Sequence, residues 1–303
     1  MNKPLQFRNA TYWLSLLLLM CSCTEEVNIT LPEEPYKLVL SCNPVAGEPL
    51  LAFVSFSTPS YAPDTTLESF TPTLLLEKNG QPLETLVPLE GSIQSWVGTI
   101  PMEEGVNYTI SASAMNFQTI SANTTIPLPT RLNPFLMDSS TYSYNQLNKD
   151  TSVLRVPLKI IPNDLSSSDS LFAFRVEYQI VTTSQNEIEQ KATFIADGNI
   201  FVNLHESPNG TFLVNKKLWN NNPNAELPID VLMPYNPNQT KSITIILEWR
   251  TVSEDYYKYY LSLSKQGNYG IIFSTPDVLY NNILNGYGNF SGFNRSRYYI
   301  KVK

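Results

Sequence analysis

The sequence predicts an all-β protein, with an N-terminal immunoglobulin-like β-sandwich over residues 36–130 and a larger β-rich domain with one short helix over residues 131–303. Short runs of β-branched and aromatic residues recur between turn residues, whereas helical periodicity is scarce. The 22 prolines fall mainly between these runs, as expected for strand connections. Seven such runs fit into the first domain of about 95 residues, which is typical of an immunoglobulin-like sandwich.

The N-terminal domain is expected to contain seven short strands. Asn79-Gly80 lies between two apolar runs and is the pair that favours a two-residue hairpin turn. Val106, Tyr108 and Ile110 alternate with polar residues, which is the period of a strand with one buried face. The candidate strands are 36–42, 50–57, 73–78, 82–87, 94–100, 106–113 and 117–126.

The second domain is predicted to be another β-sandwich-like unit with longer strands. Residues 242–252 are the clearest strand, because their apolar and polar residues lie on opposite faces. A helix is expected near 253–266, with Ser253 as its N-cap and Gly267 at its end. The other candidate strands are 154–160, where Pro157 indicates an edge or a bulge, 171–181 and 297–303.

Residues 1–22 are predicted to be a lipoprotein signal peptide that is removed from the mature protein. Lys3 and Arg8 precede an apolar core from Trp13 to Met20. This core is far shorter than the roughly 20 apolar residues that cross a bilayer as a helix. A targeting segment is therefore the better interpretation than a membrane span.

The segment ends in Met20-Cys21-Ser22-Cys23, which resembles a lipobox. Cys23 is the predicted lipidation site, because the small Ser22 precedes it whereas the bulky Met20 precedes Cys21. The mature protein would then bind the lipid bilayer through its acylated Cys23. An ordinary cleaved signal peptide with two incidental cysteines is the alternative.

Residues 23–35 are polar and proline-containing and are expected to form a tether. Glu25 and Glu26 resemble the surface-export signal that follows the lipidated cysteine in Bacteroidota lipoproteins. This resemblance implies an outer-membrane protein that faces the cell exterior. The alternative is a tether whose two acidic residues are merely solvated.

The charge balance argues against nucleic-acid binding. Removal of Lys3 and Arg8 leaves 18 Lys and Arg (20 less these two) against 27 Asp and Glu, a mature net charge of about −9. A phosphate backbone requires a basic footprint, and no run of Lys and Arg occurs.

The cysteine count argues against a disulfide. After processing, only Cys42 and the acylated Cys23 remain, so no intramolecular disulfide is expected. Cys42 is interpreted as a small buried hydrophobic residue.

Few residues suggest chemistry, and no catalytic residue, metal site or cofactor is predicted. His205 is the single histidine, which excludes histidine clusters and favours a hydrogen-bonded loop residue. Nothing selects a catalytic pair among the 27 acidic residues. The candidate pairs are Asp64 with Glu68 and Glu187 with Glu189. Two loops contain possible calcium ligands, but both are interpreted as solvated loops rather than calcium sites: one contains Asn163, Asp164 and Asp169, and the other Asn148 and Asp150.

Aromatic residues are the candidates for ligand or partner contact. Trp96 and Trp219 lie in or beside turn-rich stretches, where exposed rings could stack on a sugar or contact a partner. Core packing is the alternative for both, and it is the prediction for Trp249, which shares an apolar strand face. Gly286, Gly288 and Gly292 are predicted to form a tight structural loop at a sandwich edge.

Three segments together resemble one family over essentially the whole mature chain. They are Leu31-Pro32-Glu33-Glu34-Pro35, Asp255-Tyr256-Tyr257-Lys258-Tyr259, and the segment from Asn281 to Gly292, which reads Asn-Asn-Ile-Leu-Asn-Gly-Tyr-Gly-Asn-Phe-Ser-Gly. The family is the Bacteroidota lipoprotein family known as domain of unknown function 4249. The resemblance implies an outer-membrane lipoprotein associated with TonB-dependent uptake receptors, and no enzymatic activity.

The resulting hypothesis is a non-enzymatic accessory or binding subunit of a TonB-dependent nutrient-uptake system at the cell surface. Its expected partners are the bilayer and a TonB-dependent outer-membrane receptor. Two alternatives remain: a structural or adhesive surface lipoprotein, and a hydrolase of unfamiliar type.

Overall fold

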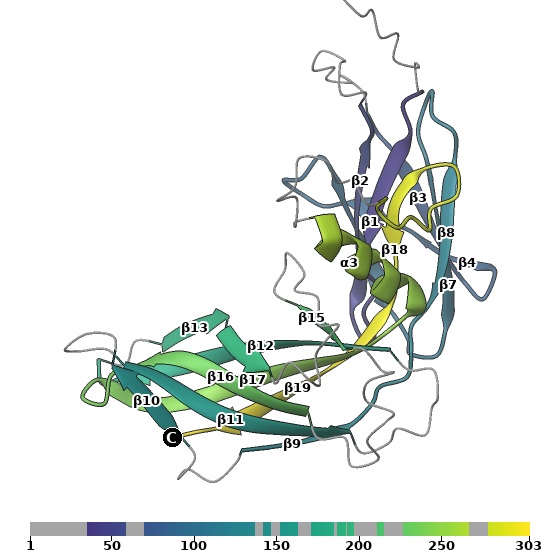
Figure 1. The fold of residues 1–303 in the computed structure, drawn as a ribbon. Helices are drawn as coiled ribbons and strands as arrows, with labels where there is room; N and C mark the ends of the chain where they lie inside the picture. Colours follow the sequence, from purple (N-terminus) through teal and green to yellow (C-terminus); the bar gives the residue numbers. More distant parts are fainter. Residues whose placement is uncertain are drawn as a thin grey trace, which may run out of the picture. The chain divides into compact units, whose positions relative to one another are not determined.

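The computed structural model describes residues 35–58, 70–136, 142–146, 152–162, 171–184, 187–191, 193–196, 211–214, 227–266 and 278–303 (Figure 1). The predicted signal peptide and tether, with Cys23, Glu25 and Glu26, lie outside these residues, as do His205 and Trp219. Within the described residues, the folded unit from Tyr36 to Lys303 consists of β-strands and one helix, which confirms the predicted all-β fold class. No helix in the described part of the chain has the length and apolarity needed to span a bilayer.

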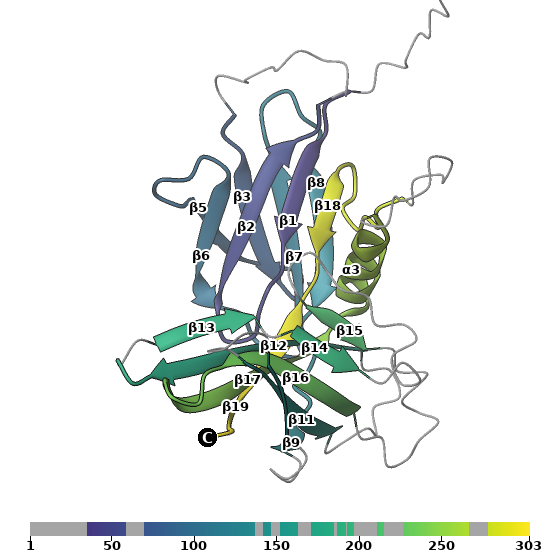
Figure 2. The same cartoon turned by 60° about the vertical axis from the view of Figure 1, so that its left-hand side comes forward.

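Two sheets enclose the first core, and their strands follow the predicted pattern. One has the order β18-β1-β2-β6-β5 and the other β4-β3-β7-β8 (Figure 2). The strands are β1 (Leu38–Cys42), β2 (Pro49–Phe56), β3 (Thr73–Lys78), β4 (Gln81–Thr85), β5 (Val87–Pro88), β6 (Ser95–Pro101), β7 (Asn107–Ser113), β8 (Ile120–Thr125) and β18 (Tyr287–Phe290).

Alternation along these strands explains why they form a two-layered structure. Leu38, Leu40 and Cys42 on β1 are buried, and the residues between them are less so. They pack in one cluster with inward residues of the other sheet, such as Leu74 and Tyr108. The predicted hairpin joins β3 to β4, with φ of 51° at Asn79 and 76° at Gly80, the left-handed values that a type I′ turn requires.

Two further sheets form the second core. One has the order β10-β11-β16-β14, with β9 also on β11, and the other has the order β13-β12-β17-β19, with β15 also on β12. The strands are β9 (Leu132–Leu136), β10 (Ser143–Gln146), β11 (Ser152–Pro162), β12 (Leu171–Thr182), β13 (Glu187–Lys191), β14 (Thr193–Ala196), β15 (Phe212–Val214), β16 (Leu227–Tyr235), β17 (Thr240–Val252) and β19 (Phe293–Lys301). The inward face of β17 is the predicted one, since Ile243, Ile245, Leu247 and Trp249 are all buried.

Pro157 lies inside a paired strand, although its lack of an N–H predicts an edge or a bulge. On one side of β11 it is paired with Asp230 of β16. On the other side, β10 pairs with residues up to Arg155 and β9 pairs with residues from Leu158 onward. Among the described strands, Pro157 therefore lies between two partners, and this position behaves as a local edge.

Part of the glycine-rich segment near the C-terminus, Tyr287–Phe290 with Gly288, is an edge strand, where a tight loop at the sandwich edge is predicted. β18 pairs in parallel with β1, from Val39 with Tyr287 to Cys42 with Phe290. The first sheet therefore includes a strand from residues 131–303. The chain then continues into β19 of the second core, so β18 and β19, which follow one another in the sequence, belong to different sheets.

Helix α3 (Glu254–Gln266) occupies the predicted position. The backbone N–H of Tyr256 donates to the Ser253 hydroxyl at 3.3 Å, as expected for an N-cap, and Glu254 and Asp255 lie in the positive first turn. Tyr256 and Tyr260 are buried and pack with Phe293 in a third cluster. The helix lies beside β18 and close to β15 and β12 (Figure 1).

Candidate functional site

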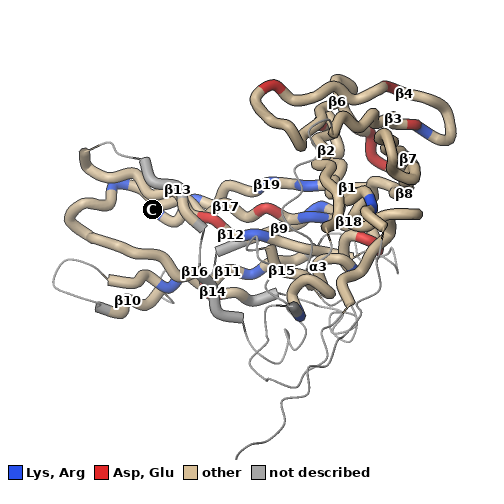
Figure 3. Tube along the Cα trace, turned by 90° about the horizontal axis from the view of Figure 1, so that it is seen from above, with Lys and Arg blue, Asp and Glu red and all other residues tan. Residues whose placement is uncertain are grey.

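Charged residues form adjacent rows on the outward face of the sheet β13-β12-β17-β19. Register places Arg175 of β12 opposite Glu248 of β17, which in turn is opposite Arg297 of β19. The next row on this face contains Arg250 opposite Arg295. Figure 3 shows that basic and acidic residues occur along β12, β17 and β19. Side chains in adjacent rows are close enough to interact, so arginines of this face can contact both glutamate and other arginines.

Glu248 is the centre of this network. Its side chain is only 6% exposed and accepts hydrogen bonds from the guanidinium groups of Arg250 and Arg297, each at 2.8 Å from Nε. Arg295 lies 3.8 Å from the same carboxylate and also pairs with Glu48. Burial raises the pKa of Glu248, but the two bonded arginines outweigh this effect and hold the pKa below its usual range. Glu248 is therefore an anion at neutral pH.

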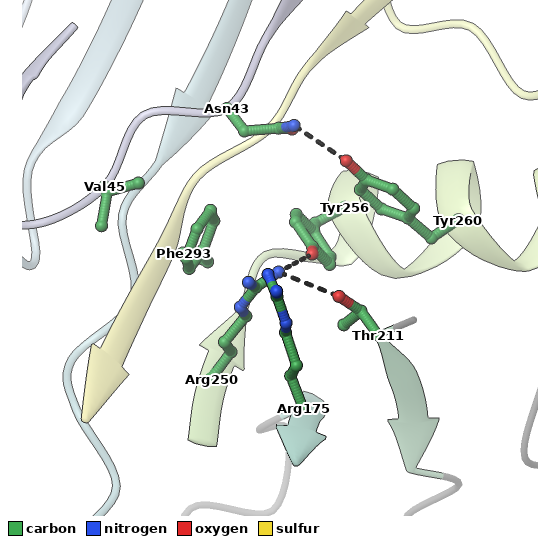
Figure 4. A pocket seen from close by; sticks show the side chains of 8 residues that line it. All are labelled: Asn43, Val45, Arg175, Thr211, Arg250, Tyr256, Tyr260 and Phe293. Carbon is green, nitrogen blue, oxygen red and sulfur yellow. Dashed lines mark hydrogen bonds between the residues drawn. The ribbon is translucent and has the colours of Figure 1, made fainter. Parts of the chain in front are cut away.

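A pocket of about 410 Å³ opens above this network (Figure 4). Its lining residues come from the segment after β1, from β12, β17 and β19, from the residue just before β15, and from α3. The lining residues are Asn43, Val45, Arg175, Thr211, Arg250, Tyr256, Tyr260 and Phe293.

Arg250 forms the floor of the pocket and is fixed on several sides. Its Nη1 donates to the Tyr256 hydroxyl at 2.8 Å and to the Thr211 hydroxyl at 3.3 Å, while Nε and Nη2 bind Glu248. Its guanidinium lies 4.7 Å from the centre of the Phe293 ring. Burial alone would lower the pKa of Arg250, but Tyr256 and Glu248 raise it overall. The cation is thus held rigidly beside the pocket.

Two tyrosines of α3, Tyr256 and Tyr260, line one side of the pocket with their rings and hydroxyl groups. The rings of Tyr256 and Tyr260 lie 4.4 Å apart between centroids. The Tyr260 hydroxyl accepts a hydrogen bond from Asn43 at 2.9 Å. Asn43 is itself oriented, because its oxygen accepts bonds from Asn289 and Ser291, both in the glycine-rich segment. The C-terminal motif therefore supports a residue of the pocket.

Arg175 is the lining residue with an unused donor. Its Nη2 pairs with Glu177. Its Nε atom is buried and has no hydrogen-bond partner among the described residues. A buried donor without a partner is uncommon in folded proteins and calls for an explanation.

The structure corrects one predicted contact residue. Trp96 is only 4% exposed and pairs with Ala52 inside the first core, so it is a packing residue rather than a surface contact. Trp219, Cys23, Glu25 and Glu26 lie outside the described residues. The described residues contain no group of three or more His, Cys, Asp and Glu arranged to hold a metal ion. Sequence reasoning missed Arg175 and Arg250 because a charge on the polar face of a strand ordinarily points into water.

A second surface with functional interest lies on the outward side of the first sheet. Leu51 and Val87 both pair with Val97, one on each side, and Phe53 follows two residues along β2. Exposed fractions are 41% for Leu51, 48% for Phe53 and 51% for Val87, and Ile93 in the preceding turn is 88% exposed. We call these five residues the outer apolar face. Contiguous exposed apolar residues of this kind mark interaction surfaces.

Comparison with known proteins identifies the family but supplies no activity. The family model described as Domain of unknown function (DUF4249) matches residues 24–298. No curated protein matches the chain significantly. Among solved structures, the C-terminal domain of the Streptococcus pyogenes antigen I/II-family protein AspA is similar at 8% identity with a TM-score of 0.15, covering 73% of this chain and 96% of that one.

Proposed function

The chain belongs to the DUF4249 family, a domain of unknown function, and we propose that it is a lipid-anchored, surface-facing outer-membrane protein that acts by binding a partner rather than by catalysis. The proposed partner is a TonB-dependent receptor, which the chain serves as an accessory subunit in nutrient uptake. The outer apolar face carries this proposal, because a monomeric surface protein gains nothing from exposing Phe53, Leu51 and Val87 together.

The position of the predicted anchor supports a partner in the membrane. Thirteen residue steps separate Cys23 from Tyr36, and an extended chain covers at most about 3.5 Å per step, or about 45 Å in all. The first sandwich follows directly after this tether and contains the outer apolar face. A lipid on Cys23 would therefore keep that face close to the extracellular surface of an integral receptor. Glu25 and Glu26 support export to that side of the membrane.

The test is recovery of the partner from gently solubilised outer membrane of the native host. The chain carries a C-terminal tag, and mass spectrometry identifies the proteins that are recovered with it. We expect a TonB-dependent receptor in stoichiometric amount with the wild-type chain. The Cys23→Ala form should leave the membrane fraction and lose the receptor; full retention of this form in the membrane contradicts the anchor.

Variants of exposed residues test whether the receptor is recovered because it binds the outer apolar face or because it co-purifies non-specifically. The double variant Leu51→Ser, Phe53→Ser removes apolar area from the outer apolar face without touching the core. The matched control is Met115→Ser, which removes an 84% exposed apolar side chain in the turn after β7. We expect the double variant to lose the receptor and the control to retain it. Recovery of the chain alone from intact membrane would instead favour the adhesive alternative.

A further inference from the structure

We propose that the pocket between α3 and the charged face of β12 and β17 binds a small organic anion, whose carboxylate or equivalent oxyanion is held by Arg175 and the tyrosine hydroxyls. This site is separate from the outer apolar face, and the inference does not depend on the proposed receptor. It rests on four observations: an unused guanidinium donor, two oriented hydroxyls, the absence of acidic groups from the described lining residues, and the volume of the cavity.

The first observation is the geometry of Arg175. Glu177 holds its Nη2, which fixes the guanidinium and leaves Nε without a partner among the described residues. The side chain is nevertheless 31% exposed and lines the pocket. In Figure 4 the side chain extends toward the guanidinium of Arg250. A guanidinium that is held on one side by Glu177 and lines the pocket is suited to bind an oxyanion.

The second observation is the orientation of the hydroxyl groups. Tyr256 accepts a hydrogen bond from Arg250, and Tyr260 accepts one from Asn43. A phenol that already accepts a bond still has its own proton to donate. Burial raises the pKa of Tyr256 to about 12 and also raises that of Tyr260, so both hydroxyls keep this proton at neutral pH. Both tyrosines therefore offer donors to a ligand.

The third observation is the sign of the charge around the cavity. Among the described residues, the eight that line the pocket include two arginines and no Asp or Glu. Glu177 and Glu248, on the same strands as the two arginines, are already bonded to arginines. Arg175 and Arg250 occupy adjacent rows of neighbouring strands on one face, so the two cations lie close to each other. An anion between them would relieve their repulsion, whereas a second cation would add to it.

The fourth observation is the size and the apolar part of the wall. A volume of about 410 Å³ falls at the lower end of the roughly 300–1,000 Å³ typical of small-molecule sites. Val45, Phe293 and the tyrosine rings provide apolar surface next to the donors. This combination fits a single oxyanion attached to a short apolar or cyclic body.

The test is calorimetric titration of the full chain in mild detergent with benzoate, and with benzyl alcohol as its neutral counterpart. We expect saturable one-to-one binding of benzoate, and binding of benzyl alcohol weaker by at least about tenfold. Inorganic phosphate and sulfate are titrated separately. Benzoate binding assigns the site to carboxylates, whereas binding of only phosphate or sulfate assigns it to those oxyanions.

Substitutions of pocket residues test whether benzoate binds in this pocket. Arg175→Gln should weaken benzoate binding by at least about tenfold, while Arg155→Gln, which removes a more exposed arginine paired with Asp230 on β16, should leave it unchanged. Tyr260→Phe removes one donor and keeps the ring, so it should weaken binding severalfold even if Arg175→Gln impairs folding. Equal affinity for benzoate and benzyl alcohol, no binding of any probe, or unchanged affinity in Tyr260→Phe overturns the proposal.

Discussion

Gly288 lies so close to Leu40 that a β-carbon on the glycine would be 1.8 Å from the leucine carbonyl oxygen. The glycine also has φ of +122°, a conformation that side chains rarely allow. Gly286 is similarly constrained, since its β-carbon would lie 2.6 Å from the carbonyl oxygen of Leu38. The two glycines let β18 approach β1 closely, which explains the glycine spacing of the C-terminal segment.

Gly288→Ala is therefore predicted to destabilise the protein by about 3 kcal/mol or more, because both the backbone conformation and the contact with Leu40 must change. Gly91→Ala is the matched control: Gly91 has φ of +80° but nothing within 4 Å of its would-be β-carbon. The control should lose only about 1–2 kcal/mol, the cost of a left-handed residue. Urea unfolding measures both values. Equal losses would show that the close approach to Leu40 is unimportant.

A second prediction concerns Asn282, whose side chain forms hydrogen bonds to the backbone of Phe290 as a neighbouring strand would. Its oxygen accepts the N–H of Phe290 at 2.9 Å, and its amide nitrogen donates to the Phe290 carbonyl at 2.8 Å. Asn282→Ala leaves both backbone groups unpaired and should cost about 2 kcal/mol by urea unfolding. Asn107→Ala, which removes an exposed bond to Thr125, should change stability by less than about 0.5 kcal/mol. A similar loss in both variants would contradict this role.

The third prediction is that Glu248→Gln destabilises the protein by about 3–5 kcal/mol at pH 7, because it leaves the largely buried Arg250 without its anion. Glu254→Gln is the control, since Glu254 is 71% exposed in its pair with Lys258, and it should have little effect.

The effect of Glu248 should also depend on pH in a defined direction. Because its folded pKa lies below the unfolded value, ionised Glu248 contributes its full stability above the ordinary glutamate pKa of about 4.3. This contribution is lost as the pH falls through the folded pKa. The difference in unfolding free energy between wild type and Glu248→Gln should therefore narrow below about pH 4. A constant difference from pH 7 to pH 3 would contradict the assignment.

Local patterns were sufficient to predict most strands and the helix. The alternation in β1, the Asn79-Gly80 turn and the Ser253 cap each depend on neighbouring residues, and the structure confirms them. The pairing of Tyr287 with Val39 depends on residues about 250 positions apart, and no local period encodes it. For this reason the sequence of the glycine-rich segment predicts a loop.

The pocket was less accessible to sequence reasoning than the fold. Arg175 and Arg250 become neighbours only through the register that places Arg175 opposite Glu248. Each by itself has the appearance of a solvated charge on a strand. Trp96 shows the opposite error, because its nearby turn suggested exposure while its place opposite Ala52 puts it in the core.

The last prediction concerns the reactivity of Cys42. Its side chain is 2% exposed, and its thiol donates to the Leu51 carbonyl at 3.2 Å. Burial raises the pKa of this thiol well above its usual range, so almost no thiolate is present at pH 8. In a Cys21→Ser, Cys23→Ser background, mass spectrometry should find no iodoacetamide adduct until urea unfolds the protein. Ser41→Cys in the same background with Cys42→Ala moves the thiol to the exposed face of β1 and should react under native conditions. Rapid native labelling of Cys42 would mean that the first sheet opens on the timescale of the reaction.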